Sequence, residues 1–265
     1  MINLHQEFIK KHKNRKRLIL LIQIFILISI IGIWELFATL NIIEEFIFSK
    51  PSKIFSLFIQ YLVNNELLRH TFVSTYEVVL GLILGTSLGL LTAIILFEIP
   101  ILAKIFDPFL VVFNALPKTA LAPILIIWVG ANIKGILVVS ISISLIITII
   151  NALNAFNNVD KEKIKLFDTF GATKLQTLWY LILPANKNEI LNIIRINIGM
   201  SWIGVIVGEF IVSKEGLGYL ITYGTQIFRL DIVMMGIVTL AIITIGMYKL
   251  LNLIAKILNK NKGKD

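Results

Sequence analysis

The stretch LILLIQIFILISIIGIWELFATL, residues 18–40, decides the fold class of this chain. It is almost entirely apolar, and a helix of about 20 such residues crosses a hydrocarbon layer about 30 Å thick. The apolar core of a secretory signal is shorter, about 7–15 residues, and a small-x-small cleavage site does not follow this stretch. We therefore interpret residues 18–40 as a retained membrane span.

Five more apolar runs follow, and the composition agrees with them. The chain of 265 residues is 57% hydrophobic and only 15% charged, whereas a soluble domain is about 25% charged. Only helices and closed barrels satisfy their backbone polar groups in lipid. The sequence therefore predicts an all-α, polytopic membrane protein with about six transmembrane helices in a single domain, residues 18–256. The expected spans are residues 18–40, 73–97, 106–130, 134–156, 190–212 and 231–256.

The net charge of +9 comes largely from basic residues beside the apolar runs. This placement is typical of cytoplasmic flanks of membrane spans, not of a nucleic-acid-binding surface. Six spans return the chain to its starting side, so we expect residues 1–17, the hydrophilic loop 157–189 and the tail 257–265 all to be cytoplasmic. The flanking basic residues are Lys10, Lys11, Lys13, Arg15, Lys16, Arg17, Lys256, Lys260, Lys262 and Lys264.

The sequence offers no catalytic or metal-binding constellation. It contains no cysteine, its three histidines lie outside the expected spans, and it has no G-x-x-x-x-G-K-[ST] phosphate loop. We expect a non-enzymatic chain without a cofactor of its own. If transport is driven by nucleotide, a partner chain must bind ATP and magnesium.

The loop 157–189 is longer than two neighbouring spans need, since helix connections usually take about 2–8 residues. Asp160 can cap a first short helix, Gly171 and Ala172 interrupt it, and Thr173 with Gln176 has the spacing of a capping box for a second. The pattern predicts two amphipathic helices, the second ending at Leu183-Pro184. They form either a partner-docking element or a mere linker.

Residues 51–64 have the apolar spacing of one further amphipathic helix, either lying on the outer membrane surface or serving as a packed connector.

The third span contains Pro117 and Pro123 on either side of Lys118 and Thr119. Proline removes a backbone donor, and a lysine at membrane depth is costly unless it faces protein, water or an interface. The segment either lines a pathway with non-helical backbone or is a proline kink whose lysine reaches an interface.

The fifth span carries Arg195, Trp202 and Glu209 seven residues apart, which places them on one helix face. Fourteen residues rise about 21 Å, so Arg195 and Glu209 cannot pair with each other. Charged residues within a span are candidates for function. They either line a pathway or extend to opposite membrane interfaces.

Two glycine patterns point to close helix packing. Gly81, Gly85 and Gly89 recur every fourth residue in the second span, as do Gly204 and Gly208 in the fifth. Such strips let another helix approach closely. The partner helix belongs either to this chain or to a second subunit.

The loop stretch DTFGATKLQTLWYLILP, residues 168–184, resembles the loop signature of ABC importer permeases, an E-A-A followed by a glycine and later L-P. Similar stretches are WELFATL from Trp34, ALPKTALAPILIIWVGA from Ala115, IRINIGMSWIGVIVGEFI from Ile194 and EGLGYLI from Glu215. The chain is thus similar over most of its length to the nitrate, sulfonate, taurine and thiamine-precursor branch of that family.

The resemblance implies a type I ABC importer permease fold that works by alternating access in the cell membrane. It implies three kinds of partner: ABC ATPase subunits, a second permease subunit that is expected to be a copy of this chain, and an extracytoplasmic solute-binding protein. The lipid bilayer surrounds the spans, and no nucleic acid is implied. The implied ATPase-docking residues are Asp168, Gly171, Ala172, Leu175, Leu183 and Pro184.

The sequence departs from the signature where Lys165, Leu166 and Phe167 replace the E-A-A and where Asn188 replaces a later proline. The transported solute stays open between nitrate, sulfonates, taurine and vitamin precursors. Two other functions remain in view, an ion-coupled secondary transporter and a structural anchoring subunit. The first would carry its own ion site and often an internal repeat.

Overall fold

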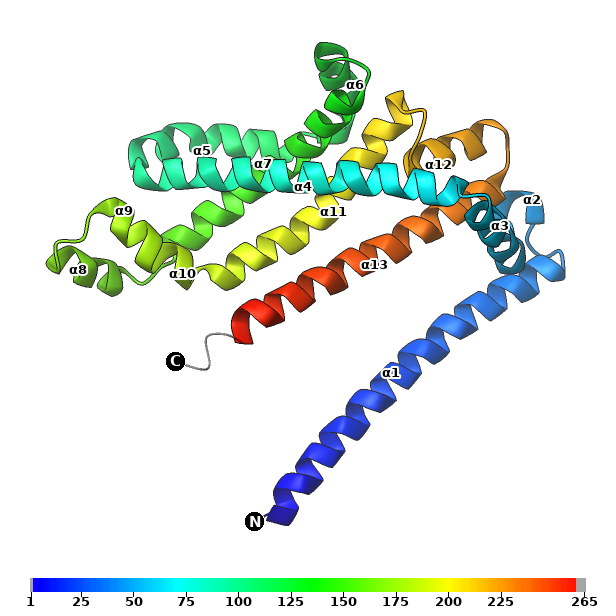
Figure 1. Ribbon diagram of the computed structural model, residues 1–265, viewed down its shortest axis with the longest axis horizontal. Coiled ribbons are helices and arrows are strands. Elements are labelled where there is room, and N and C mark those ends of the chain that lie inside the picture. The colour runs from blue at the N-terminus through cyan, green and yellow to red at the C-terminus, as the bar shows by residue number, and fades with distance from the viewer. Residues whose placement is uncertain (1, 261–265) are drawn as a thin grey trace.

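The computed structural model describes the backbone of residues 2–260, and every regular element in that range is helical (Figure 1). Five helices are long and apolar enough to cross a membrane, or up to six if one bent pair counts as a span. This confirms the predicted all-α fold with about six spans. The five long helices are α1 (Ile2–Thr39), α4 (Glu66–Glu98), α7 (Ile133–Asn157), α11 (Lys187–Val212) and α13 (Leu230–Lys260).

The bent pair replaces the single third span that we expected at residues 106–130. It consists of α5 (Pro100–Ala115) and α6 (Lys118–Val129), which meet at an angle of 100°. The break falls at Leu116, whose ψ of 136° is extended. A proline disfavours the helical conformation of the residue before it, so Pro117 explains why the chain turns there. Pro123, by contrast, lies inside α6.

Helix α7 is the centre of the molecule, because both glycine strips pack against it. A Cβ atom on Gly81 would lie 2.9 Å from Ser140 Cβ, and one on Gly85 would lie 3.2 Å from Ser144 Cβ. On the other side, a Cβ on Gly204 would lie 3.0 Å from the backbone nitrogen of Ser140. The partner helix of both strips is therefore in this chain, and α7 lies between α4 and α11. The two remaining glycines, Gly89 and Gly208, meet Thr148 and Ile136 of α7.

Polar side chains join the same three helices in the buried interior. Asn197 of α11 donates through Nδ2 to Thr86 Oγ1 of α4 at 2.8 Å and to Thr148 Oγ1 of α7 at 2.7 Å. Side-chain hydrogen bonds between membrane helices are worth roughly 0.6–2 kcal/mol each. They fix the register in which the small residues meet.

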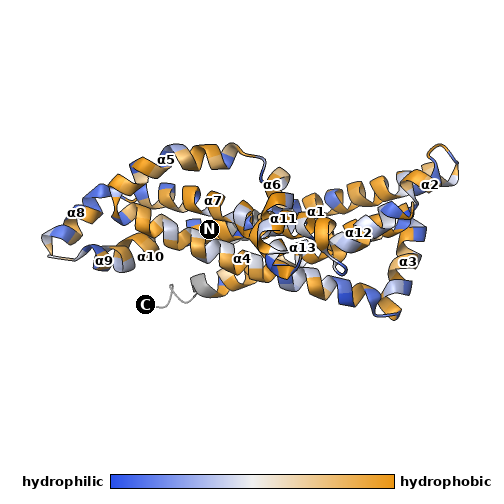
Figure 2. Ribbon diagram, turned by 90° about the horizontal axis from the view of Figure 1, so that it is seen from above, coloured by the Kyte–Doolittle hydropathy of each residue, from blue (hydrophilic) through white to orange (hydrophobic). Residues whose placement is uncertain are grey.

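The long helices end in two groups, which we call the loop end and the far end. The loop end carries the short helices of residues 160–185, and the start of α1 and the end of α13 lie toward the same side (Figure 1). The far end carries α2 (Glu45–Phe48), α3 (Pro51–Val63) and α12 (Leu217–Gln226). Figure 2 shows hydrophobic residues dominating the long helices and hydrophilic residues gathering at these two ends.

The predicted surface helix at residues 51–64 corresponds to α3. Ile54 and Leu57 are buried in the main core, while Phe55 on the other face is exposed. The predicted cytoplasmic tail lies largely outside the described residues, as do the side chains of Lys10, Lys13, Lys16 and Lys260.

A single methyl group tests the packing on α7. Gly204→Ala places a Cβ against the backbone of Ser140, which cannot move aside without moving α7. We expect a loss of about 1–3 kcal/mol from overpacking, measured as a lower melting temperature of the detergent-solubilised chain. Gly246→Ala in α13 is the matched control, since a Cβ there meets nothing within 4 Å. Equal melting temperatures for the two variants would contradict the close approach.

Candidate functional site

The loop between α7 and α11 begins with α8 (Lys161–Thr169). Asp160 caps this helix, as the sequence predicts, by accepting a hydrogen bond at Oδ1 from the backbone nitrogen of Glu162 at 2.9 Å. The helix ends at Phe170, and Gly171 follows with a φ of +74°. Glycine tolerates this left-handed conformation without strain. The turn at Gly171 therefore brings the next helix back alongside α8.

The second half of the loop begins with the predicted capping box. Thr173 N–H donates to Gln176 Oε1 at 2.7 Å, and Gln176 N–H donates to Thr173 Oγ1 at 3.3 Å. These bonds start α9 (Lys174–Thr177), which runs into a π-helical turn, η1 (Leu178–Ile182), and then α10 (Leu183–Ala185). The loop therefore contains three short elements after Gly171 where we expected one amphipathic α-helix ending at Leu183-Pro184.

The π-turn has a physical cause in the sequence. Pro184 has no N–H to donate into the helical ladder, and an extra residue in the preceding turn relieves that defect. Leu175, Leu178, Trp179 and Ile182 have the i, i+3, i+4 and i+7 spacing of the amphipathic helix that we expected here. Of these, Leu178 and Ile182 are buried, whereas Leu175 and Trp179 are 64% and 61% exposed.

The buried face fastens the loop to the spans, and the opposite face presents a patch of large apolar side chains. Leu178 and Ile182 pack with Phe156 at the end of α7. The exposed side chains, which we call the docking patch, are Leu166, Phe170, Leu175, Trp179 and Tyr180. Phe170 is the most exposed, at 81%. Clustered exposed apolar side chains on a polar protrusion mark an interaction surface.

The other predicted loop residues surround this patch. Gly171 and Ala172 line a recess of about 350 Å³ together with Phe170 and Tyr180. Asp168 is exposed and faces a second recess between α8 and the end of α4. Leu183 is half-buried and packs toward the loop core, while Pro184 is exposed.

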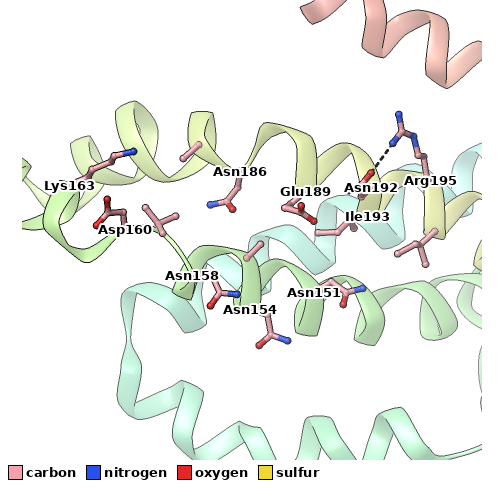
Figure 3. Close-up of a pocket in the computed structure, with 14 residues that line it drawn as sticks. Asn151, Asn154, Asn158, Asp160, Lys163, Asn186, Glu189, Asn192, Ile193 and Arg195 are labelled. Atoms are coloured by element: carbon pink, nitrogen blue, oxygen red, sulfur yellow. Dashed lines mark hydrogen bonds between the residues drawn. The ribbon is translucent and has the colours of Figure 1, made fainter. Parts of the chain in front are cut away.

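A polar cavity of about 870 Å³ lies beside the loop, between the ends of α7 and α11 (Figure 3). We call it the asparagine cavity, because five carboxamide side chains line it. They are Asn151, Asn154, Asn158, Asn186 and Asn192. Its charged residues are Asp160, Lys163, Glu189 and Arg195. The sequence shows the row Asn151, Asn154 and Asn158 at helical spacing, but we did not recognise it as a site because α11 supplies the facing wall.

Arg195 sits at one end of this cavity and is held by neutral groups. Its Nη1 donates to Asn192 Oδ1 at 2.8 Å, and its Nε donates to Asn252 Oδ1 of α13 at 3.2 Å. In the described part of the chain, no carboxylate forms an ion pair with Arg195. The amide oxygens orient the guanidinium but leave its positive charge uncompensated.

The other two residues predicted on this face of α11, Trp202 and Glu209, do not line the asparagine cavity. Trp202 is buried in the main core with Val205 and Leu217. Glu209 is 1% exposed, so its side chain is enclosed by the protein. It accepts hydrogen bonds from Ser74 Oγ at 2.5 Å and from Gly218 N at 2.6 Å. The carboxylate thus binds the start of α12, where backbone N–H groups lack partners within the helix.

Two glycines make room for this carboxylate. A Cβ on Gly218 would lie 2.7 Å from Glu209 Cβ, and a Cβ on Gly216, which has a φ of +110°, would overlap the carboxylate itself. The glycines of EGLGYLI therefore serve the contact between α11 and α12. Sequence analysis missed this contact because it depends on the chain folding back after α11.

The residues Ser74 and Glu77 of α4 are further members of this site that sequence analysis missed. Glu77 is 3% exposed and lines a cavity of about 280 Å³ with Lys214 and Glu215. Glu215 also forms an ion pair with Arg69 of α4. In the next turn of contacts, His70 Nδ1 of α4 accepts a hydrogen bond from the backbone nitrogen of Gly216 at 2.9 Å. The sequence signal that could have identified Glu77 is an acidic residue inside an apolar run, here residues 73–97.

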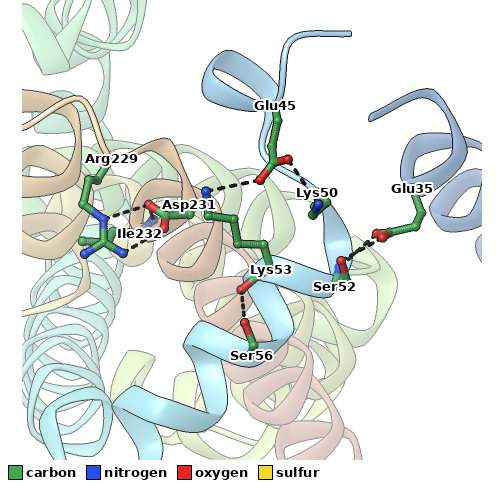
Figure 4. Close-up of polar contacts among 9 residues, drawn as sticks. All are labelled: Glu35, Glu45, Lys50, Ser52, Lys53, Ser56, Arg229, Asp231 and Ile232. Carbon is green, nitrogen blue, oxygen red and sulfur yellow. Dashed lines mark hydrogen bonds and ion pairs between the residues drawn. The ribbon is translucent and has the colours of Figure 1, made fainter. Parts of the chain in front are cut away.

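Surface ion pairs and hydrogen bonds fix the short helices at the far end (Figure 4). Glu35 accepts from the backbone nitrogen of Ser52 at 2.9 Å, which ties α1 to α3. Glu45 lies 3.2 Å from Lys50 and 3.4 Å from Lys53, and the hydrogen bonds from these two lysines hold the pKa of the Glu45 carboxyl below its ordinary value. Arg229 and Asp231 form a further ion pair at 2.8 Å.

Of the residues in the bent pair, Lys118 is half-buried and Thr119 is exposed. Lys118 Nζ donates to the backbone oxygen of Asn114 at 3.2 Å, across the break between α5 and α6. The side chain of Lys118 therefore forms a hydrogen bond with the turn that joins α5 and α6.

Comparison with known proteins agrees with this architecture. The sequence model of the family described as "Binding-protein-dependent transport system inner membrane component" matches residues 81–264. A probable ABC transporter permease protein of Haemophilus influenzae is 30% identical, with 82% of this chain and 87% of that protein covered. The likeness therefore extends over most of both chains.

Relatives named for particular solutes are also similar. A putative aliphatic sulfonates transport permease protein of Bacillus subtilis is 29% identical, covering 89% of this chain and 86% of the relative. The taurine transport system permease protein of Escherichia coli is 26% identical, covering 81% of this chain and 80% of the relative.

The contact between Glu209 and α12 can be tested by proteolysis. Glu209→Ala leaves the Ser74 hydroxyl and the Gly218 N–H without their buried acceptor, at a cost of about 1–3 kcal/mol each. We expect α12 to detach more often, so that trypsin cleaves after the exposed Lys214 about ten-fold faster. The matched control is Asp107→Ala, which removes an exposed carboxylate of α5 and leaves the residues around Lys214 unchanged. The idea is wrong if both variants are cut at the same rate.

Proposed function

Since this chain belongs to the family of binding-protein-dependent transport system inner membrane components, as a permease subunit of an ABC importer for a small solute, we propose that a separate ATPase drives it by docking on the loop 157–189. In this proposal the partner binds ATP and magnesium. The chain itself contributes the translocation pathway and the docking surface. Family membership favours this function over an ion-coupled secondary transporter.

The docking patch is the observation that carries the proposal. Five large apolar side chains are exposed on the loop, beyond the ends of the long helices. Burying an aromatic side chain such as Phe170 or Trp179 in a groove of a partner would contribute about 1.5–3 kcal/mol from apolar area alone. Interface hot spots are enriched in such residues.

The connection between the patch and the spans gives the ATPase a way to move them. Leu178 and Ile182 anchor the loop on Phe156 of α7, and α7 is packed tightly between α4 and α11. Movement of the loop would therefore be passed to the three central helices as one unit. ATP binding would favour one arrangement of the spans and hydrolysis would release it, a shift between two states.

The remaining partners and the orientation are part of the same proposal. We propose a complex of two permease subunits, two ATPase subunits and an extracytoplasmic solute-binding protein in the cell membrane. Both chain termini and the loop face the cytoplasm, as the flanking basic residues indicate. The solute is small and polar or anionic, of the sulfonate, taurine, nitrate or vitamin-precursor type.

Co-purification with an ATPase encoded beside this chain tests the docking surface. Phe170→Asp places a charge at the most exposed side chain of the docking patch, so we expect at least about a ten-fold loss of bound ATPase. Phe228→Asp is the matched control, because Phe228 is 71% exposed at the far end. Retention of the ATPase by Phe170→Asp, or its equal loss from both variants, would contradict docking at this patch.

The orientation is tested with single cysteines, since the chain has none of its own. Lys174→Cys in the loop and Lys214→Cys at the far end should react with a membrane-impermeant thiol reagent from opposite sides of sealed vesicles. In right-side-out vesicles we expect labelling at position 214 and protection at position 174. Labelling of both positions from one side would show the topology to be wrong.

A further inference from the structure

The asparagine cavity combines five carboxamide side chains with the guanidinium of Arg195, whose charge the neighbouring amides orient but do not neutralise. Its volume of about 870 Å³ lies within the usual range of small-molecule sites, about 300–1,000 Å³. Carboxamides both donate and accept hydrogen bonds, so they bind polar groups of either kind. Of these five side chains, Asn186 donates to the backbone oxygen of Ile182 and Asn192 orients Arg195, while the glycine contacts between α7 and α11 lie farther along both helices.

The charges of the cavity are unevenly placed. Arg195 lies at one end, and Asp160 and Lys163 lie at the other (Figure 3). Asp160 uses Oδ1 to cap α8. With Glu189, the lining carries two acidic and two basic side chains, so a polyanion such as a nucleotide triphosphate would find no excess of positive charge. A solute with one anionic group would find its partner at the Arg195 end.

The hydrogen bonds of Arg195 prepare it for that role. Asn192 and Asn252 engage Nη1 and Nε without neutralising the charge. Among the described residues no hydrogen bond from Nη2 is present, so this nitrogen can donate to a ligand. A guanidinium presents a planar fork of donors that matches carboxylate and sulfonate oxygens.

We propose that the asparagine cavity is the site from which the solute leaves toward the cytoplasm, and that Arg195 determines specificity there by binding a single carboxylate or sulfonate group. The inference rests on the proposed importer function. It names the solute as a small monoanion or zwitterion with further hydrogen-bonding groups. The wall formed by Asp160 and Lys163 belongs to the docking loop, so a bound solute contacts the element that the ATPase moves.

The electrostatic part of the proposal is tested with a reporter thiol. Asn154→Cys introduces a single cysteine into the cavity wall, at an exposed position of a chain that otherwise has none. The full-length chain, co-expressed with its ATPase and solubilised, is treated with methanethiosulfonate reagents of similar size, one bearing a sulfonate and one a trimethylammonium group. The ratio of the two rates, relative to a free thiol, reports the local potential.

We expect Arg195→Gln to lower the ratio of the anionic to the cationic rate about five-fold, as loss of one nearby unit charge implies. Lys134→Gln is the matched control, since this exposed lysine at the start of α7 lies at the other end of that helix from the cavity and its loss should leave the ratio unchanged. If Arg195→Gln does not fold, the rate ratio of the Asn154→Cys chain with Arg195 intact is measured at increasing salt concentration. Because salt screens charges, this ratio must then approach the value of a free thiol. A rate ratio that changes neither on Arg195→Gln substitution nor with salt concentration overturns the proposal.

Ligand recognition is tested in the same Asn154→Cys chain with two small probes. Methanesulfonate should slow the reaction of the introduced thiol with an uncharged thiol reagent, whereas dimethyl sulfone, which is neutral and similar in shape, should not. Arg195→Lys keeps the charge but loses the fork, so it should retain the rate ratio and lose most of the protection. Equal effects of the two probes would overturn specific recognition. ATPase co-purification is measured in the same preparations, so failure of the docking proposal is seen separately.

Discussion

The close approach of α4 and α11 to the two sides of α7 is the contact on which the rest of the structure depends. Between membrane helices, surrounding lipid is as apolar as the side chains, so packing and buried hydrogen bonds hold the helices together. Gly81 and Gly85 on one side and Gly204 on the other bring backbones against Ser140 and Ser144. Because these contacts involve backbone and short side chains, the three helices can shift little against one another. They form the rigid body to which the loop, the bent pair and α12 are attached.

The two ends of α11 use charge in opposite ways. At the far end, Glu209 is surrounded by donors from α4 and α12, and its buried carboxylate serves as a structural acceptor. At the loop end, Arg195 is oriented by amide oxygens and keeps an uncompensated charge beside a cavity. A buried carboxyl group whose oxygens are hydrogen-bonded fixes a contact between helices, and a charge that is oriented without being neutralised is available to a ligand. This difference separates a structural residue from a candidate functional one on the same helix face.

The apolar side chains of the loop divide into two sets. Leu178 and Ile182 in the π-turn are buried, whereas Leu175 and Trp179 are exposed. The first pair holds the loop on α7, and the second pair faces outward. A loop anchored by one apolar face and exposed on the other can transmit force between a partner and the spans. Lys165, Leu166 and Phe167 replace the family's E-A-A, and Leu166 is one of the exposed side chains of the docking patch.

The sequence by itself determined the membrane class, the helical fold, the capped helices of the loop and the family resemblance. These depend on the length of apolar runs, on local hydrogen bonds such as those of Asp160 and Thr173, and on short motifs, all of which are properties of neighbouring residues. Only the tertiary structure decided that both glycine strips meet α7, that Glu209 binds the start of α12 beside Glu77, and that two rows of asparagines enclose a cavity with Arg195. Each of these joins residues from helices far apart in the chain, and their meeting depends on helix rotation and packing that no local pattern specifies.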